Sequence, residues 1–144
     1  MTEDPKTFGL KQYDVLGHEF AGEVIRCGSA VSGLKPGDRV AVAPMRGCGH
    51  CDSCRKGEPA WCAEMRLIGG GYAELTTVAA RQCRILPDDL PTAEGALAEP
   101  VAVALHCVMR SGLKPGDRVL ILGAGPIGLL VAFWARRQGA RDVI

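Results

Sequence analysis

The sequence predicts a mixed β and α/β fold, in which a β-rich domain is followed by the beginning of an α/β domain. Short apolar runs in the first half, such as residues 21–25 and 39–43, are cut by glycine and proline. This rhythm is typical of short strands joined by tight turns. After residue 118 an apolar run, a glycine turn and a helix-like stretch indicate a βαβ unit. A length of 144 residues suits one domain and part of a second.

The elements of the first half follow from local signals. Pro36 and Gly37 predict a type II turn, because proline presets φ at the second position and glycine accepts the positive φ of the third. The nonapeptide at 32–40 recurs at 111–119, which we interpret as the same turn-into-strand device used twice. Residues 46–66 have little periodicity, so we expect a loop held by a metal rather than by a core.

Further strands are predicted at 72–79 and 83–86. A helical stretch is then expected from near Thr92 to about Arg110, with an interruption at Pro100. The run at 119–122 predicts a short buried strand, residues 123–128 a glycine turn, residues 126–138 a helix and residues 140–144 another strand.

Composition limits the classes of partner and compartment. Lys and Arg number 17 against 16 Asp and Glu, so no strong field attracts nucleic acid or an anionic membrane. No run approaches the roughly 18 apolar residues needed to span a bilayer, and the first residues are too polar for a signal peptide. We therefore expect a cytoplasmic protein with neither nucleic acid nor membrane as a partner. The odd count of seven cysteines suits metal ligation better than a disulfide framework.

Four of those cysteines, Cys48, Cys51, Cys54 and Cys62, are separated by two, two and seven residues. Such spacing lets a compact loop place four thiolates around one tetrahedral zinc ion. Four thiolates leave zinc no open position, so the site is expected to be structural. An iron–sulfur cluster is disfavoured, because the bacterial run places its fourth cysteine after three residues. That cluster and a set of unligated thiols remain open alternatives.

Other candidate residues are less decisive on sequence alone. The segment 123–128, Gly-Ala-Gly-Pro-Ile-Gly, matches a dinucleotide fingerprint after an apolar run, although an ordinary strand-to-helix turn is the alternative. His18 follows an apolar run and fits either a structural or a ligand role. Glu99 fits a carboxylate favoured at a helix N-terminus. Cys107, eight residues further on, is expected to be a buried apolar thiol.

Together these features resemble the zinc-dependent medium-chain dehydrogenases, the alcohol and polyol dehydrogenase family. The resemblance spans the chain from about Tyr13 to Ile144. It is carried, in the family's order, by residues 17–22 with Gly28 and Val31, the four cysteines, and residues 70–74, 99–106 and 123–128. It implies a GroES-like β-barrel-type domain at 1–100 with a structural zinc lobe at 46–66. Residues 101–144 would then form a linking helix and the start of a Rossmann dinucleotide-binding domain.

The resemblance also implies a function and assigns residues to it. Reversible oxidation of a secondary alcohol, such as a polyol, a sugar alcohol or a hydroxy amino acid, would pass a hydride to NAD or NADP. His18 and Glu99 would hold a catalytic zinc, and Glu19 would lie beside or transiently on it and assist exchange of its ligands. Glu99 points to the sorbitol-dehydrogenase-like branch, since ordinary alcohol dehydrogenases have a cysteine there. A structural zinc is assigned to Cys48, Cys51, Cys54 and Cys62, and the pyrophosphate turn to Gly123, Gly125, Pro126, Ile127 and Gly128. The intact protein would be a homo-oligomer, a dimer or tetramer, with a small-molecule alcohol as its substrate.

Two departures from the family modify these expectations. No cysteine occurs among the 16 residues before Gly17, where the family has another zinc ligand, and the chain ends before the residue that distinguishes NAD from NADP. We therefore expect an internal portion of a family member that is inactive by itself. A non-catalytic zinc-binding structural or interaction module is the first alternative, and a redox or iron–sulfur protein the second. A zinc-free quinone-reductase-like member is disfavoured, because it has no use for the cysteines or His18.

Overall fold

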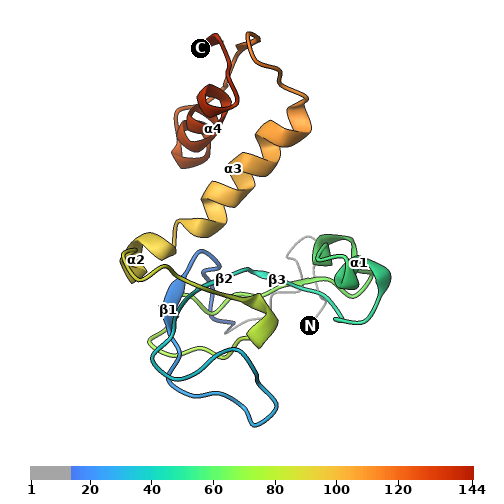
Figure 1. Ribbon diagram of the computed structural model, residues 1–144, viewed down its shortest axis with the longest axis vertical. Helices are drawn as coiled ribbons and strands as arrows, with labels where there is room; N and C mark the ends of the chain where they lie inside the picture. The colour runs from blue at the N-terminus through green and yellow to red at the C-terminus, as the bar shows by residue number, and fades with distance from the viewer. Residues whose placement is uncertain (1–13) are drawn as a thin grey trace. The chain divides into compact units, whose positions relative to one another are not determined.

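The computed structural model describes residues 14–144 (Figure 1). The polar first residues, on which the expected absence of a signal peptide rests, and Tyr13 lie outside the described residues. The chain divides into two compact units, the first ending at Ala96 and the second running from Leu97 to Ile144. The predicted domain boundary after residue 100 stays a prediction. None of the described helices combines the length and apolar character needed to cross a membrane.

The first unit is built on an antiparallel three-stranded sheet in the order β1-β2-β5. These strands are β1 (Ala21–Glu23), β2 (Arg39–Val42) and β5 (Cys83–Ile85). The central strand supplies most of the core, because Val40, Ala41 and Val42 are all buried. The short helix α2 (Thr92–Gly95) contacts β1 and β2. The strands predicted at 21–25, 39–43 and 83–86 are confirmed, each one or two residues shorter.

The repeated nonapeptide forms the same turn in both of its copies. In the first copy the backbone N–H of Asp38 donates to the Lys35 carbonyl at 3.1 Å, and Gly37 has φ +92°. The Asp38 carboxylate accepts a hydrogen bond from the Lys35 backbone N–H at 2.8 Å. In the second copy the Asp117 N–H donates to the Lys114 carbonyl at 3.1 Å, and Gly116 has φ +90°. The Asp117 carboxylate accepts from the Lys114 N–H at 2.9 Å. The predicted type II turn is confirmed, and each copy leads into a strand.

The prediction of a strand at 72–79 is wrong, because this segment forms no strand. Residues 72–75 form bends, 76–79 have no regular structure, and 72–77 are exposed. Tyr, Leu, Thr and Val favour strands only where a neighbouring strand pairs with them and a core covers one face. Among the described residues no strand pairs with this segment. The Tyr72 backbone N–H donates to the Leu16 carbonyl at 3.0 Å, which ties the start of the segment to residues outside any strand.

The second unit contains two helices and a pair of short parallel strands. Helix α3 (Ala98–Ser111) contacts helix α4 (Pro126–Arg137), and the Trp134 indole N–H donates to the Val101 carbonyl at 3.1 Å. Strand β6 (Arg118–Val119) pairs in parallel with β7 (Asp142–Val143). The predicted βαβ unit is therefore confirmed, and α4 ends one residue before its predicted end.

Two details of the second unit differ from the predictions. Pro100 does not interrupt a helix, because it is the third residue of α3, where a backbone N–H has no partner inside the helix. The interruption lies at residues 96–97 instead. The run at 119–122 is not a buried strand, since Leu120 and Leu122 are 67% and 88% exposed. A parallel strand is buried throughout only when other elements cover both of its faces.

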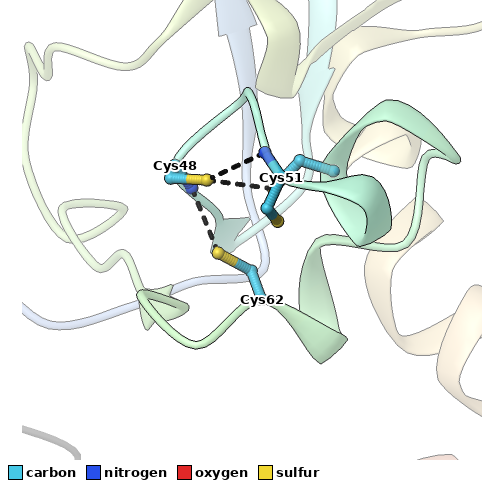
Figure 2. Close-up of side chains that lie close together, drawn as sticks. Cys48, Cys51 and Cys62 are labelled. Carbon is cyan, nitrogen blue, oxygen red and sulfur yellow. Dashed lines mark hydrogen bonds between the residues drawn. The ribbon is translucent and has the colours of Figure 1, made fainter.

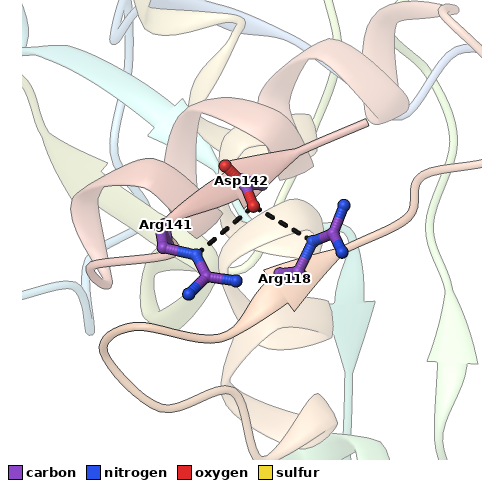
Figure 3. Close-up of polar contacts among 3 residues, drawn as sticks. All are labelled: Arg118, Arg141 and Asp142. Atoms are coloured by element: carbon purple, nitrogen blue, oxygen red, sulfur yellow. Dashed lines mark hydrogen bonds and ion pairs between the residues drawn. The ribbon is translucent and has the colours of Figure 1, made fainter.

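Figure 3 shows an ion-pair cluster on the strand pair β6–β7. The Asp142 carboxylate lies 3.0 Å from Nε of Arg118 and 3.4 Å from Nε of Arg141. Arg118 and Asp142 are also direct partners in the strand register. All three side chains are largely exposed, so the cluster contributes at most about 1 kcal/mol. Its effect is to reinforce the register rather than to hold the unit together.

Candidate zinc lobe and dinucleotide turn

The lobe at 46–66, predicted as a loop, contains several small elements. Strands β3 (Met45–Arg46) and β4 (Arg66–Leu67) pair antiparallel at its base. Between them lie a single helical turn, α1 (Asp52–Arg55), and a 3-10 turn, η2 (Pro59–Trp61). Cys62 is the one hydrophobic residue of this segment that is buried. The lobe therefore lacks a hydrophobic core, as the sequence predicts.

Two polar side chains that sequence reasoning missed make long-range hydrogen bonds, one to the lobe and one to Ala43 just before it. Both belong to the 3-10 turn η3 (Ala80–Gln82). Gln82 is only 2% exposed, and its amide donates to the Ala43 carbonyl at 2.8 Å. The Arg81 guanidinium donates to the Gly47 carbonyl at 2.8 Å. Both bonds connect residues more than 30 positions apart, so no local sequence signal could have revealed them.

The structure brings all four predicted cysteines together. The sulfur atoms of Cys48, Cys51, Cys54 and Cys62 lie within 4.8 Å of one another, and those of Cys48 and Cys54 are 4.0 Å apart. A tetrahedral zinc with Zn–S bonds of about 2.3 Å requires sulfurs about 3.8 Å apart. All seven cysteines of the chain are free. The four-cysteine cluster is therefore consistent with a zinc site, and its closed donor set fits a structural ion.

Backbone N–H groups point at the sulfurs of this cluster. Cys51 N–H donates to Cys48 Sγ at 3.4 Å, and Cys48 N–H donates to Cys62 Sγ at 3.3 Å (Figure 2). Glu64 N–H also donates to Cys62 Sγ, at 3.3 Å. Such bonds favour thiolates over thiols, which is the state that zinc requires. Gly47 is a further requirement that the sequence analysis missed, because a Cβ there would collide with Cys54 Sγ.

The backbone and the neighbouring thiols separate the acidities of two of these cysteines. Hydrogen bonds from the backbone N–H of His50, and then from that of Cys51, lower the pKa of Cys48 to about 6. For Cys54 the backbone N–H of Gly49 lowers the pKa, but burial and the other three thiols together outweigh it and raise the pKa to about 11. Without metal, Cys48 is thus a thiolate at neutral pH and Cys54 a thiol.

This difference predicts selective alkylation of the reduced, metal-free chain. Iodoacetamide reacts with thiolates, so at pH 7.5 Cys48 should be modified well before Cys54. Its rate should rise as the pH is raised through about 6 and level off above pH 7, because deprotonation is then complete. Peptide mass spectrometry at timed intervals measures both rates. Equal rates at the two cysteines, or a midpoint near the ordinary thiol value, would contradict the prediction.

The segment that contains His18 and Glu19 is held by a glycine-rich strip. Gly17 has φ +84°, and its carbonyl accepts a hydrogen bond from the Gly71 N–H at 2.9 Å. The Tyr72 ring lies against Gly17, where an added Cβ would approach ring carbons to 2.8 Å. His18 is half-buried and Glu19 exposed, and their ligand atoms lie within 4.8 Å of each other. Two donors of metal-ligating type are thus presented by adjacent residues.

Glu99 lies in the first turn of α3, in the second unit, and is half-buried. Cys107, on the same helix, was expected to be a buried thiol, and this expectation is wrong because it is exposed. The buried residues of α3 are Pro100, Ala104 and Val108, at intervals of four. Residue 107 lies beside this stripe rather than on it.

The glycine turn at 123–128 has the local geometry of the predicted fingerprint. Gly123 has φ +110°, and Gly125 is the N-cap of α4, with open space where its Cβ would lie. A Cβ on Gly128 would collide with the Gly123 carbonyl oxygen. Pro126 is the first residue of the helix, and Ile127 is 41% exposed. The first two glycines therefore leave the helix N-terminus accessible to an anion, and the third permits the close turn.

A groove of about 620 Å³ runs along this turn. It is lined by residues 119–123 and 125–128 together with side chains of α3 and α4. Apolar walls beside a helix N-terminus suit a ligand that combines a flat ring system with phosphate groups. The second unit therefore has the local features of a dinucleotide site, and the first unit those of a thiolate-bound metal site.

A thiolate lobe on a β-domain that precedes a glycine-turn βαβ unit defines the class of zinc-containing medium-chain dehydrogenases. Residues 3–88 match the family described as alcohol dehydrogenase GroES-like domain. The chain belongs to this family.

Individual relatives agree with this assignment. The chain is 40% identical over 142 residues to probable D-xylulose reductase A of Neosartorya fischeri, covering 95% of this chain and 40% of the relative. It is 40% identical over 136 residues to sorbitol dehydrogenase of Bombyx mori, covering 90% of this chain and 39% of that relative. A Sinorhizobium meliloti structure, described as a zinc-binding dehydrogenase bound to NADP, matches with TM-score 0.82 and 43% identity, over 92% of this chain and 40% of that one.

These comparisons confirm the predicted family and fold class. The fold of a GroES-like domain followed by the start of a Rossmann domain is shared with the S. meliloti structure. The relatives include a sorbitol dehydrogenase, which agrees with the sorbitol-dehydrogenase-like branch that the resemblance indicated. The chain spans about two fifths of the length of the relatives it matches.

Proposed function

We propose that the whole protein is a zinc-dependent dehydrogenase that reversibly oxidises a secondary alcohol, a polyol or a related sugar alcohol, and passes a hydride to NAD or NADP. The observation that carries this proposal is the presence, in one chain, of a four-thiolate lobe and a glycine turn at a helix N-terminus. The names of the relatives, a D-xylulose reductase and a sorbitol dehydrogenase, support a polyol as the substrate. Hydroxy amino acids remain within the same reaction class.

The proposal assigns two zinc ions to two donor sets. Cys48, Cys51, Cys54 and Cys62 would hold a structural ion, whose closed thiolate shell leaves no position for substrate. His18 and Glu99 would hold the catalytic ion, and Glu19 beside it would assist exchange of its ligands. A zinc ion with fewer than four protein ligands keeps a position open for the substrate oxygen. A catalytic zinc supplies Lewis acidity, which lowers the pKa of the bound alcohol.

The remaining roles fall to groups of this chain. The Gly17 segment, fixed by the backbone of residues 70–72, would hold the His18 imidazole in place. Gly123, Gly125 and Gly128, with Pro126 and Ile127, would shape the turn that receives the cofactor pyrophosphate. This turn would direct the cofactor phosphates to the N-terminus of α4.

The decisive experiment compares Glu99→Ala with Cys107→Ala in the protein purified from its own cells. Reduction of NAD or NADP is followed with sorbitol and xylitol as substrates. We expect turnover in the native protein, a loss of about 100-fold or more in Glu99→Ala, and no change in Cys107→Ala. No cofactor reduction by zinc-loaded native protein would favour the alternative, a non-catalytic zinc module. A loss in Cys107→Ala instead would reverse the ligand assignment.

The proposal extends to compartment and assembly. Seven free cysteines, four of them clustered as metal ligands, support a reducing compartment, the cytoplasm. We further propose that the whole protein is a homo-oligomer, a dimer or tetramer. Light scattering of the purified protein measures its mass, and a monomer would contradict this part.

A further inference from the structure

His50 and Glu64 lie on the zinc lobe but do not belong to its four cysteines. A ring nitrogen of His50, a carboxylate oxygen of Glu64 and the Cys48 sulfur lie within 4.8 Å of one another. His50 and Glu64 are exposed, whereas Cys48 is half-buried and Cys62 is 6% exposed. The lobe therefore has two donor sets that share one sulfur, an outer one open to solvent and an inner one that is closed.

The backbone positions of both outer residues are fixed. The Arg55 side chain donates to the His50 carbonyl at 2.7 Å. Nδ1 of His50 lies 3.3 Å from the Cys48 carbonyl oxygen. In the tautomer that donates this bond, the lone pair on Nε2 is available to a metal, which is the usual arrangement of a ligating histidine. The backbone of Glu64 is fixed by its N–H bond to Cys62 Sγ, at 3.3 Å.

The outer donor set has the chemistry of a transient zinc site. Imidazole nitrogen, carboxylate oxygen and thiolate sulfur are the three ligand types that proteins offer zinc. Three protein donors leave further positions to water, so an ion held there can still exchange its ligands. Because Cys48 belongs to both sets, an ion bound in the outer set is already attached to the inner one.

We propose that Cys48, His50 and Glu64 form a loading site that captures zinc from solvent and passes it to the four cysteines. This proposal rests on the structural zinc site proposed above. Zinc is first bound by the outer three donors. The sulfurs of Cys51, Cys54 and Cys62 then replace His50, Glu64 and the bound water, and each thiol that becomes a ligand loses its proton to solvent. No electron transfer is involved, and the ion keeps its charge throughout.

The test measures zinc binding and release in the reduced, metal-free chain, with zinc alone as the probe. The variant carries His50→Ala and Glu64→Ala together, and Glu58→Ala, another exposed carboxylate of the lobe, is the matched control. Stopped-flow mixing with a zinc indicator gives the association rate, and mixing with a chelator gives the release rate. We expect both rates to fall about tenfold or more in the double variant, because capture by an exposed charged site speeds association. The equilibrium dissociation constant and the stoichiometry should not change.

The possible outcomes separate this proposal from the one on which it rests. Unchanged rates in the double variant would overturn the loading site. A second zinc ion that the native chain retains and the double variant loses would also overturn it, by showing an independent site. A native chain that binds no zinc at the cysteines would overturn both proposals. His50→Gln and Glu64→Gln as single variants keep the side-chain bulk, and each should slow association on its own.

Discussion

Replacing Cys51 with serine is expected to release the structural zinc and unfold the lobe at 46–66. The lobe has no hydrophobic core, so metal ligation supplies the free energy that folds it, about 10 kcal/mol or more for structural zinc sites. Zinc content should fall from one ion per lobe to a small fraction. Limited proteolysis should then cut within the lobe, which the folded form protects.

Cys107→Ser is the matched control for this change, because Cys107 is exposed and belongs to another unit. It should keep the zinc content and the proteolysis pattern of the native chain. An unchanged zinc content in Cys51→Ser would contradict the assignment of the cluster.

Replacing Gly128 with valine is expected to disrupt the glycine turn of the second unit. A Cβ at this position would collide with the Gly123 carbonyl oxygen, and backbone cannot move aside as a flexible side chain can. Overpacking of this kind costs about 1–3 kcal/mol or more. Urea unfolding measures the loss of stability, and fluorescence titration with NADH or NADPH measures the accompanying loss of dinucleotide binding.

Gly125→Ala separates the two expected effects of Gly128→Val, the loss of stability and the loss of dinucleotide binding. Its Cβ would meet open space, and its φ of −74° suits alanine, so the stability of the unit should remain nearly unchanged. Dinucleotide binding should still weaken, because the Cβ would occupy the space that the pyrophosphate approaches. Stability lost in Gly125→Ala, or retained in Gly128→Val, would contradict this account of the turn.

The features predictable from sequence are those with local causes. Four cysteines within 15 residues are close enough along the chain to reach one common centre, and the structure brings their sulfurs together. The turn at residues 35–38 depends on Gly37, with φ +92°, and on Asp38, whose carboxylate accepts a hydrogen bond from the Lys35 backbone N–H. The helix at 126–137 begins at the proline that marked its start.

The features that could not be predicted depend on distant neighbours. Residues 72–79 have strand-forming side chains, but no described strand pairs with them. Gln82 and Arg81 reach carbonyls 39 and 34 positions away, which no local pattern specifies. Cys107 is exposed because of its position around the α3 axis, which places it beside the buried stripe that Ala104 and Val108 form.

X-ray absorption at the zinc edge tests the central claim most directly. The sample is the purified chain with His18→Ala, so that the proposed catalytic ion does not contribute to the spectrum. The account predicts one zinc ion per chain, with a first shell of four sulfur atoms at about 2.3 Å. A first shell dominated by nitrogen or oxygen, or iron in place of zinc, would contradict it.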